Sequence, residues 1–157
     1  MFVGSPWSVV PAHVDRHHNV LLQVAGTKEL TVGWFDDPAE HAEALEARFT
    51  DRPNPERLPP VTRTFRLGPG DGVYLPAYTF HWVEAGDTVS VALSCGFSTA
   101  ATERAELVRR CNAKLRRFGL RPRPPGVSER GDRAKAALFA TAKRVRGAIA
   151  TGVNRHA

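Results

Sequence analysis

The 157-residue sequence is poor in cysteine, with only Cys95 and Cys111, and this scarcity excludes a scaffold held together by several disulfide bonds. It also lacks any run of about 18 consecutive apolar residues, which excludes a membrane-spanning helix. Residues 1–7 contain neither a basic segment nor a long apolar run, so we expect no signal peptide. Together these absences predict a cytoplasmic protein with reduced thiols.

Lysine is scarce as well, with 4 lysines against 18 arginines, and acidic residues are scarce in the last third of the chain. Residues 104–157 contain 15 Lys and Arg against 3 Asp and Glu, a net charge of +12, whereas residues 1–103 contain 7 against 13, a net charge of −6. Basic tails are found on nucleic-acid arms and on proteins with acidic partners. Arginine bias with abundant Ala, Gly and Pro is also typical of GC-rich coding. We therefore interpret the charge as weak support for a nucleic-acid partner and disfavour one.

The chain does contain enough apolar sequence for one domain with a sizeable core, at 42% apolar and 24% charged residues. Residues 20–24 and 29–35 are expected to pair as a hairpin with Gly26 near its tip. Many short strands with Gly and Pro turns predict a mainly β sandwich or barrel. Apolar or alternating segments predict these strands at residues 9–15, 20–24, 29–35, 61–67, 73–76, 80–84 and 88–94.

An insertion at residues 36–60 interrupts the strands of the predicted barrel domain, which spans residues 1–100. It begins with a helix at 37–49, which an Asp-Pro pair and apolar residues at helical spacing predict. Glu46 is expected on the acidic face of this helix. A Pro-rich loop without regular structure completes it.

A basic helical extension, residues 101–157, follows the barrel. Thr102 is expected to cap the first of its two helices and Gly119 to end it, while Asp132 is expected to cap the second. Apolar stripes on both helices predict that the extension docks on the barrel.

The leading chemical signal is His13-x-Asp15 with a later His81. A His and a carboxylate two positions apart on a strand project to the same side. A third ligand from a distant strand then completes a 2-His-1-carboxylate face, which leaves three positions open and is typical of non-haem Fe(II). Lys28 follows a turn, where it either is solvated or points into the barrel. An inward lysine would imply an anionic partner, because buried lysines are rare unless paired.

The other histidines are expected mainly on the surface. His17 and His18 adjoin the motif but fall on neighbouring faces of a turn, and His41 lies on the acidic helix. A metal or substrate role for His17 or His18 is kept as a minor alternative.

Several motifs occur in an order and spacing that resemble a known superfamily. They are His13-Val14-Asp15, the segment 19–28, and the segment 69–76 that ends five residues before His81. Over residues 2–97 the chain resembles JmjC or cupin-like Fe(II)/2-oxoglutarate oxygenases, and most closely the asparaginyl-hydroxylase type. The resemblance implies a double-stranded β-helix, also called a jelly-roll barrel.

The resemblance also implies a role for the residues that match. His13, Asp15 and His81 match the iron ligands and so form the expected catalytic centre. Lys28 matches the lysine that pairs with the distal carboxylate of 2-oxoglutarate.

Further residues are expected around the co-substrate. Asn19 matches a polar residue lining its pocket, and Ser94 stands about where the family's last strand offers a polar group. Tyr74 is a candidate because aromatics often line the mouths of ligand pockets.

Besides Ser94, the sequence departs from the family pattern in two further places. A hydroxyl residue often stands three positions before the first iron-binding His, where this chain has Val10. Residue 1 falls almost at the first barrel strand, where the family usually has a preceding support region. We therefore expect a compact or N-terminally truncated relative with a more open pocket.

The implied activity is that of an Fe(II)- and 2-oxoglutarate-dependent dioxygenase, which uses O2 to hydroxylate a substrate while 2-oxoglutarate becomes succinate and carbon dioxide. A protein or peptide side chain is the expected substrate, with a small metabolite second. Demethylation of N-methyl-lysine is a lesser outcome of the same chemistry.

Two other functions remain open from the sequence. One is a catalytically weak metal-binding cupin that acts as a binding or regulatory module, with its basic tail contacting an acidic partner or nucleic acid. The other is a cupin isomerase or metal-sensing cupin, which would need metal but no Lys28. The C-terminal helices offer a surface for a homodimer, and no membrane partner is expected.

Overall fold

The computed structural model describes residues 1–49 and 57–153, with side chains through residue 142 in the last helix. The chain divides into two compact units, Met1–Thr102 and Glu103–Ala157. The centre of the predicted Pro-rich loop, residues 52–55, lies outside the described residues. Val145 and Ile149, which belong to the apolar stripe expected on the second C-terminal helix, lie beyond the described side chains.

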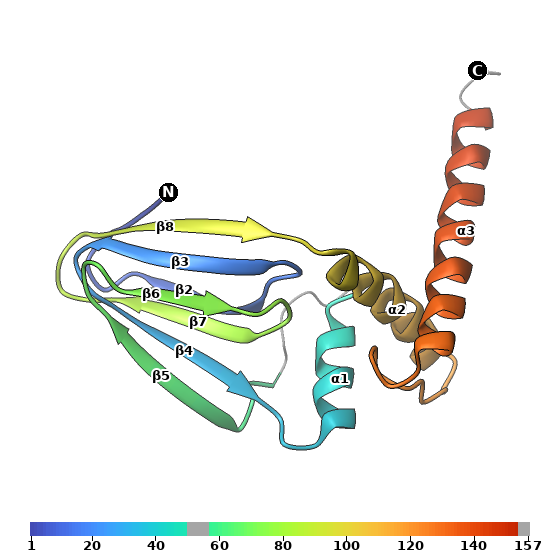
Figure 1. Ribbon diagram of the computed structural model, residues 1–157, viewed down its shortest axis with the longest axis horizontal. Helices are drawn as coiled ribbons and strands as arrows, with labels where there is room; N and C mark the ends of the chain where they lie inside the picture. Colours follow the sequence, from blue (N-terminus) through green and yellow to red (C-terminus); the bar gives the residue numbers. More distant parts are fainter. Residues whose placement is uncertain (50–56, 154–157) are drawn as a thin grey trace. The chain divides into compact units, whose positions relative to one another are not determined.

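The first unit is built from two four-stranded antiparallel sheets (Figure 1). One has the strand order β1-β8-β3-β6 and the other the order β2-β7-β4-β5. This arrangement confirms the predicted jelly-roll barrel. The strands are β1 (Phe2–Gly4), β2 (Val9–Val14), β3 (His18–Ala25), β4 (Lys28–Trp34), β5 (Val61–Leu67), β6 (Gly72–Leu75), β7 (Phe80–Ala85) and β8 (Ser90–Phe97).

The core of the barrel comes from apolar side chains that alternate along its strands. Because successive residues of a strand face opposite sides, every second residue of β3, β4, β5, β6 and β8 reaches the interior. Burying these side chains contributes roughly 25 cal/mol per Å² of apolar surface. The central residues, each at most 8% exposed, are Leu21, Leu30, Leu67, Leu75 and Ala92.

The predicted hairpin of residues 20–24 and 29–35 is wrong, because the two strands lie in different sheets. β3 pairs with β6 and β8, whereas β4 pairs with β5 and β7. Gly26 lies in the crossover between the sheets, in a left-handed conformation with φ +67°. A Cβ at this position would lie 2.3 Å from the carbonyl oxygen of Val89, so the crossover requires glycine.

The predicted acidic helix is present as α1 (Pro38–Ala47), which is capped by Asp37 accepting a hydrogen bond from the Ala39 amide at 2.9 Å. Its buried residues Ala42, Leu45 and Glu46 share one face, since positions 42, 45 and 46 have the spacing of a packed helical stripe. The prediction that Glu46 lies on the acidic face, opposite the apolar residues of the helix, is therefore wrong.

His41 of α1 was expected on the surface but packs against aromatic side chains of the barrel. Its ring centroid lies 5.6 Å from that of Phe80 and 6.3 Å from that of Phe35. These contacts anchor α1 beside β7, on the opposite side of the strand from His81, because residues 80 and 81 face opposite ways.

The second unit contains most of α2 (Ala100–Arg117) and α3 (Glu129–Val153). Thr99 caps α2, as its hydroxyl accepts from the Thr102 amide at 3.2 Å, so the predicted cap at Thr102 is wrong by three residues. The predicted end at Gly119 is confirmed, with φ +79° just beyond the last helical turn.

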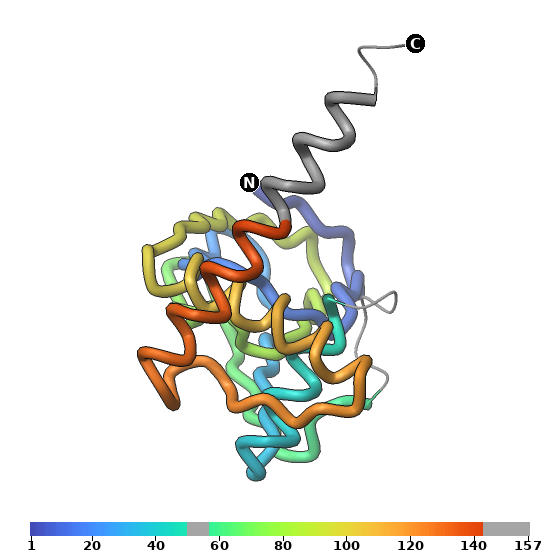
Figure 2. The backbone as a smooth tube through the Cα atoms, turned by 90° about the vertical axis from the view of Figure 1, so that its right-hand side faces the viewer, coloured from blue at the N-terminus to red at the C-terminus, as the bar shows by residue number. Residues whose placement is uncertain are grey.

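The start of α3 also differs from the prediction. Ser128 caps the helix by accepting from the Gly131 amide at 3.2 Å, and Asp132 instead accepts from the Gly126 amide at 2.7 Å. Figure 2 follows the backbone from α2 through the connection into α3. The carbonyl of Arg123 holds this connection, since it accepts from Asn112 of α2 and Lys135 of α3. No helix among the described residues is both long and apolar enough to span a membrane.

Candidate metal centre and pocket

His13 and His81 lie directly opposite each other on the neighbouring strands β2 and β7, with ring centroids 4.2 Å apart. Asp15 follows β2, and its Oδ2 is 3.9 Å from Nε2 of His81. One ligand atom of each residue lies within 4.8 Å of those of the other two. The three predicted ligands therefore converge on one point that a single cation could occupy.

Both histidines are oriented by backbone carbonyls two residues earlier in the chain. Nδ1 of His13 is 2.8 Å from the Pro11 oxygen, and Nδ1 of His81 is 2.9 Å from the Thr79 oxygen. Because a carbonyl only accepts, each Nδ1 carries the proton and each Nε2 is left as a lone-pair donor. This tautomer is the one a metal requires of an Nε2 ligand.

His81 is only 5% exposed, and this burial lowers its pKa. The Thr79 carbonyl raises the pKa, the nearby His13 lowers it further, and Asp15 raises it, with burial the largest effect. A neutral His81 is consistent with metal ligation, since a proton on the ring would compete with the cation.

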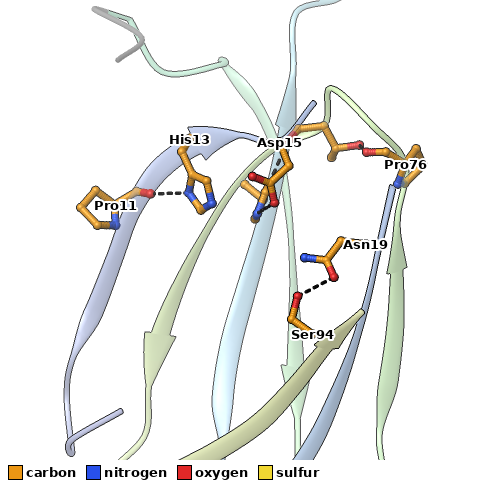
Figure 3. A network of polar contacts seen from close by, with 8 residues as sticks. Pro11, His13, Asp15, Asn19, Pro76 and Ser94 are labelled. Carbon is orange, nitrogen blue, oxygen red and sulfur yellow. Dashed lines mark hydrogen bonds and ion pairs between the residues drawn. The ribbon is translucent and has the colours of Figure 1, made fainter. Parts of the chain in front are cut away.

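The three residues line a pocket of about 500 Å³ inside the barrel. Figure 3 shows His13, Asp15 and Asn19 turned toward the same space between the strands. The pocket wall also carries Lys28 and Ser94. Six of the seven predicted site residues thus meet in one cavity, while their functional roles stay predictions.

Lys28 is buried at 8% exposure at the start of β4. No hydrogen bond or ion pair within the described part of the chain engages its ammonium group. Burial lowers the pKa of Lys28, because the charged form is desolvated. Lys28 is therefore a candidate binding group for an anion.

Asn19 and Ser94 come from the paired strands β3 and β8 and are joined by a hydrogen bond in which the Ser94 hydroxyl donates to Oδ1 of Asn19 at 2.7 Å (Figure 3). This bond leaves the amide nitrogen of Asn19 free to donate into the pocket. Both side chains line the same pocket as His13, Asp15 and His81.

Tyr74 does not reach the pocket. It neighbours Leu75, which faces the interior, so Tyr74 faces the outside of the sheet and is 52% exposed. Its hydroxyl instead lies 2.6 Å from Nδ1 of His18. The expectation of a pocket-lining Tyr74 is therefore corrected.

The pocket contains residues that sequence reasoning did not assign. Ser90 lines it because it shares the inward face of β8 with Ala92 and Ser94, and strand alternation could have predicted this. Ser8 lies outside any strand and gave no such signal. His17 lines the rim, where it packs so closely on Gly96 that a Cβ there would lie 2.7 Å from its ring.

A family model described as a JmjC domain matches residues 3–105. Among solved structures, the chain is similar to the CENP-C cupin domain of Drosophila melanogaster, with 14% identity and a TM-score of 0.43 over 60% of this chain and 56% of that one. It is similar to a cupin superfamily protein of Desulfitobacterium hafniense, with 15% identity and a TM-score of 0.39 over 62% of each chain. It is also similar to an oxalate decarboxylase variant of Bacillus subtilis, with 14% identity and a TM-score of 0.44 over 75% of this chain and 27% of that one. The chain thus spans less than two-thirds of each of these solved chains.

Proposed function

We propose, from the premise that the chain belongs to the JmjC domain family, that it is an Fe(II)- and 2-oxoglutarate-dependent dioxygenase. Its substrate would be a protein or peptide side chain, with a small metabolite second. The observation that carries this proposal is the presence of two different binding groups in one pocket. These are a 2-His-1-carboxylate cluster and a buried lysine without a counter-charge among the described residues.

In this function His13, Asp15 and His81 would hold the metal through two Nε2 atoms and a carboxylate oxygen. A bound Fe(II) would supply the activation of O2 that no amino-acid side chain can provide. The protein contributes orientation, since the carbonyls of Pro11 and Thr79 fix the two rings. A donor set of this type leaves room on the metal for small ligands.

Lys28 would bind the far carboxylate of 2-oxoglutarate. It pairs with Ala85 on β7, four residues along the strand from His81, which puts the Cα positions of residues 81 and 85 about 13 Å apart. The side chain of Lys28 spans part of this distance. A short dicarboxylate can bridge the rest, between the ammonium group and the metal. Asn19 and Ser94 would hydrogen-bond the same molecule from β3 and β8.

The apolar part of the pocket wall would keep bulk water from the reacting groups. Leu21, Leu30 and Val83 line the same cavity as the polar groups. In a less aqueous environment the attraction between Lys28 and a carboxylate is stronger. His17 and Val10, at the exposed part of the wall, would meet the substrate.

The proposal is tested by anaerobic titration of the full chain with Fe(II) and then 2-oxoglutarate. The wild type should develop the weak visible absorption of an iron-chelated keto acid. Asp15→Ala should abolish iron binding, whereas Asp36→Ala, an exposed carboxylate control, should leave it unchanged. Lys28→Ala should weaken 2-oxoglutarate binding at least about tenfold while sparing iron, as expected for a lost charge-assisted contact of about 1.5–3 kcal/mol.

Glu29→Ala is the matched control for Lys28→Ala, because it changes the neighbouring exposed residue of β4. Absence of the visible band in the wild type would reject the oxygenase. Equal loss of iron and 2-oxoglutarate in Lys28→Ala would reject the assigned role of this lysine.

A second candidate function is a metal-binding module without turnover, whose basic tail contacts an acidic partner or nucleic acid. The observation that favours it is the exposure of cations in the second unit. Such a module would bind metal but would neither bind 2-oxoglutarate at Lys28 nor convert it to succinate. The exposed cations are Arg104, Lys114, Arg117, Arg121, Arg123, Arg130 and Arg133.

A further inference from the structure

His18 stands on the outer face of the barrel, three residues after Asp15, at the first position of β3. Its ring lies against two aromatic rings, with centroid distances of 5.7 Å to Tyr74 and 5.1 Å to Phe97, and these two rings also neighbour each other at 6.5 Å. Its Nδ1 lies 2.6 Å from the Tyr74 hydroxyl and 3.3 Å from the backbone amide of Ala77. Because an amide N–H only donates, Nδ1 is the acceptor, and His18 therefore carries its proton on Nε2.

The Ala77 amide belongs to the turn of residues 76–79 between β6 and β7, and this turn contacts two of the three metal-ligand residues. The amide of Tyr78 donates to the carbonyl of Asp15 at 2.8 Å. The carbonyl of Thr79 accepts from Nδ1 of His81 at 2.9 Å. A displacement of the turn would therefore move Asp15 and rotate the ring of His81 together.

The backbone of the turn is strained at Tyr78, so the turn needs supporting contacts. Tyr78 has φ +66°, a left-handed conformation that costs a bulky residue about 1–2 kcal/mol and persists only where the surroundings impose it. Within the turn, the Thr79 hydroxyl donates to the Pro76 carbonyl at 2.8 Å. His18 adds a contact from a neighbouring strand on the side of the turn opposite the pocket.

We propose that His18 is a positioning residue of the metal centre. Its Nδ1 accepts a hydrogen bond from the turn of residues 76–79 and holds this turn in place. The turn then orients Asp15 and His81. The inference depends on the proposed metal function, and it assigns a role to a histidine that is neither among the pocket-lining residues nor one of the three clustered candidate ligands. It also gives Tyr74 a role outside the pocket, as the second donor to Nδ1.

Two substitutions separate the hydrogen bond of His18 from its stacking. His18→Phe keeps a ring against Tyr74 and Phe97 but removes the acceptor. His18→Asn removes the ring but keeps an acceptor oxygen close to the position of Nδ1. A positioning role predicts that His18→Phe is the damaging variant, whereas a packing role predicts that His18→Asn is.

The experiment is a titration of the full chain with Co(II), followed by its visible absorption spectrum. The spectrum reports the geometry of the ligands around the ion, and thermal unfolding of the metal-free variants reports packing. His18→Phe should weaken Co(II) binding about tenfold, at the lower end of the effect of residues that orient metal ligands, and should change the spectrum. His18→Asn should bind Co(II) within about threefold of the wild type, although its lost stacking lowers the unfolding temperature.

Three results would overturn the inference. His18→Phe with wild-type affinity and spectrum would mean that the Nδ1 contact does not orient the ligands. A larger loss in His18→Asn than in His18→Phe would mean that the ring acts by packing. Failure of the wild type itself to bind Co(II) would reject the proposed metal function and the inference with it, and this result is distinct from the first two.

Discussion

Lys28 combines two properties that conflict in the absence of a ligand. It is 8% exposed, and no acidic side chain or hydrogen-bond acceptor among the described residues engages its ammonium group. Burial of an uncompensated charge opposes folding, and the lowered pKa of Lys28 has the same physical origin. Under the proposed function, this loss of stability accompanies the ability of Lys28 to bind an anion.

Lys28→Met should therefore stabilise the ligand-free protein. The substitution keeps an unbranched side chain of similar length and removes the buried charge, so the free energy of unfolding should rise by roughly 1–3 kcal/mol. Urea unfolding at neutral pH measures this change. The same variant should bind 2-oxoglutarate at least about tenfold more weakly. A decrease in stability would mean that the ammonium group has a favourable partner in the folded chain.

His81 makes stability depend on pH in a direction that its environment fixes. In the unfolded chain His81 takes up a proton near pH 6.5, whereas in the folded barrel burial lowers its pKa. As pH falls from about 6.5 toward the folded pKa, the unfolded state binds more protons, and the free energy of unfolding decreases. Above about pH 6.5 His81 is neutral in both states, and protonation of this residue does not reduce the free energy of unfolding.

We expect the unfolding temperature of the metal-free wild type to fall more steeply between about pH 7 and about pH 5.5 than that of His81→Gln. Glutamine keeps a polar group near the Thr79 carbonyl but does not titrate. Differential scanning calorimetry on both proteins over this range measures the two slopes. Parallel slopes would show that His81 does not have a lowered pKa in the folded state.

At the scale of elements, the crossover between β3 and β4 determines how the two sheets meet. Gly26 occupies it with φ +67°, and an added Cβ would also clash with the carbonyl of Val89. Nε2 of Gln23 donates to the carbonyl of Ala25 and to the hydroxyl of Ser90, which ties the crossover to β8. Lys28 follows two residues later, so this connection also sets its position.

Gly26→Ala should lower the free energy of unfolding by clearly more than Gly70→Ala. Gly70 has φ +92°, but a Cβ there would meet no atom within 4 Å, so it carries the conformational cost of about 1–2 kcal/mol without a clash. Urea unfolding of both variants separates the conformational cost from the cost of the clash. Equal losses would indicate that the crossover relaxes around the new methyl group.

The features that could be predicted from the sequence are those that depend on a few neighbouring residues. Alternating residues identified the strands, and the spacing of His13 and Asp15 put them on one side of a strand, because both are properties of a few consecutive residues. The pairing of strands is not local. β4 pairs with β5 across the whole α1 insertion, with Lys28 opposite Leu67, while the nearer β3 belongs to the other sheet.

The same distinction explains the misplaced site and cap residues. Tyr74 and Leu75 are both apolar enough to face the interior, and only the register with β3 determines which one does. Asp132 has a side chain that can cap a helix, but the helix begins earlier and is capped by Ser128. Ser128 follows a segment in which Gly126 and the preceding prolines favour a turn. Choices between neighbouring candidates of similar chemistry thus depended on tertiary contacts that the sequence pattern does not encode.

For the whole molecule, the change in charge near residue 103 coincides closely with the boundary between the two units at Thr102. The acidic part contains the pocket, and the basic part contains the helices α2 and α3. In the second unit Arg117 and Arg121 are exposed at the end of α2, and no ion pair engages either of them within the described residues. Clustered, unneutralised cations of this kind attract polyanions irrespective of their sequence.

This charge division gives a prediction about the basic unit alone. Arg117→Glu with Arg121→Glu should weaken binding of the full chain to a polyanion, with DNA as the probe, and reduce the slope of log affinity against log salt by about 2. Arg63→Glu with Arg66→Glu makes the same change of net charge on the exposed surface of β5 and is the matched control. Fluorescence anisotropy at several salt concentrations measures both slopes. If the two double variants lose affinity equally, only net charge matters and the end of α2 is no binding surface. If the wild type shows no binding at about 50 mM salt, the basic unit is a solvated surface, and the alternative of a polyanion-binding module is rejected.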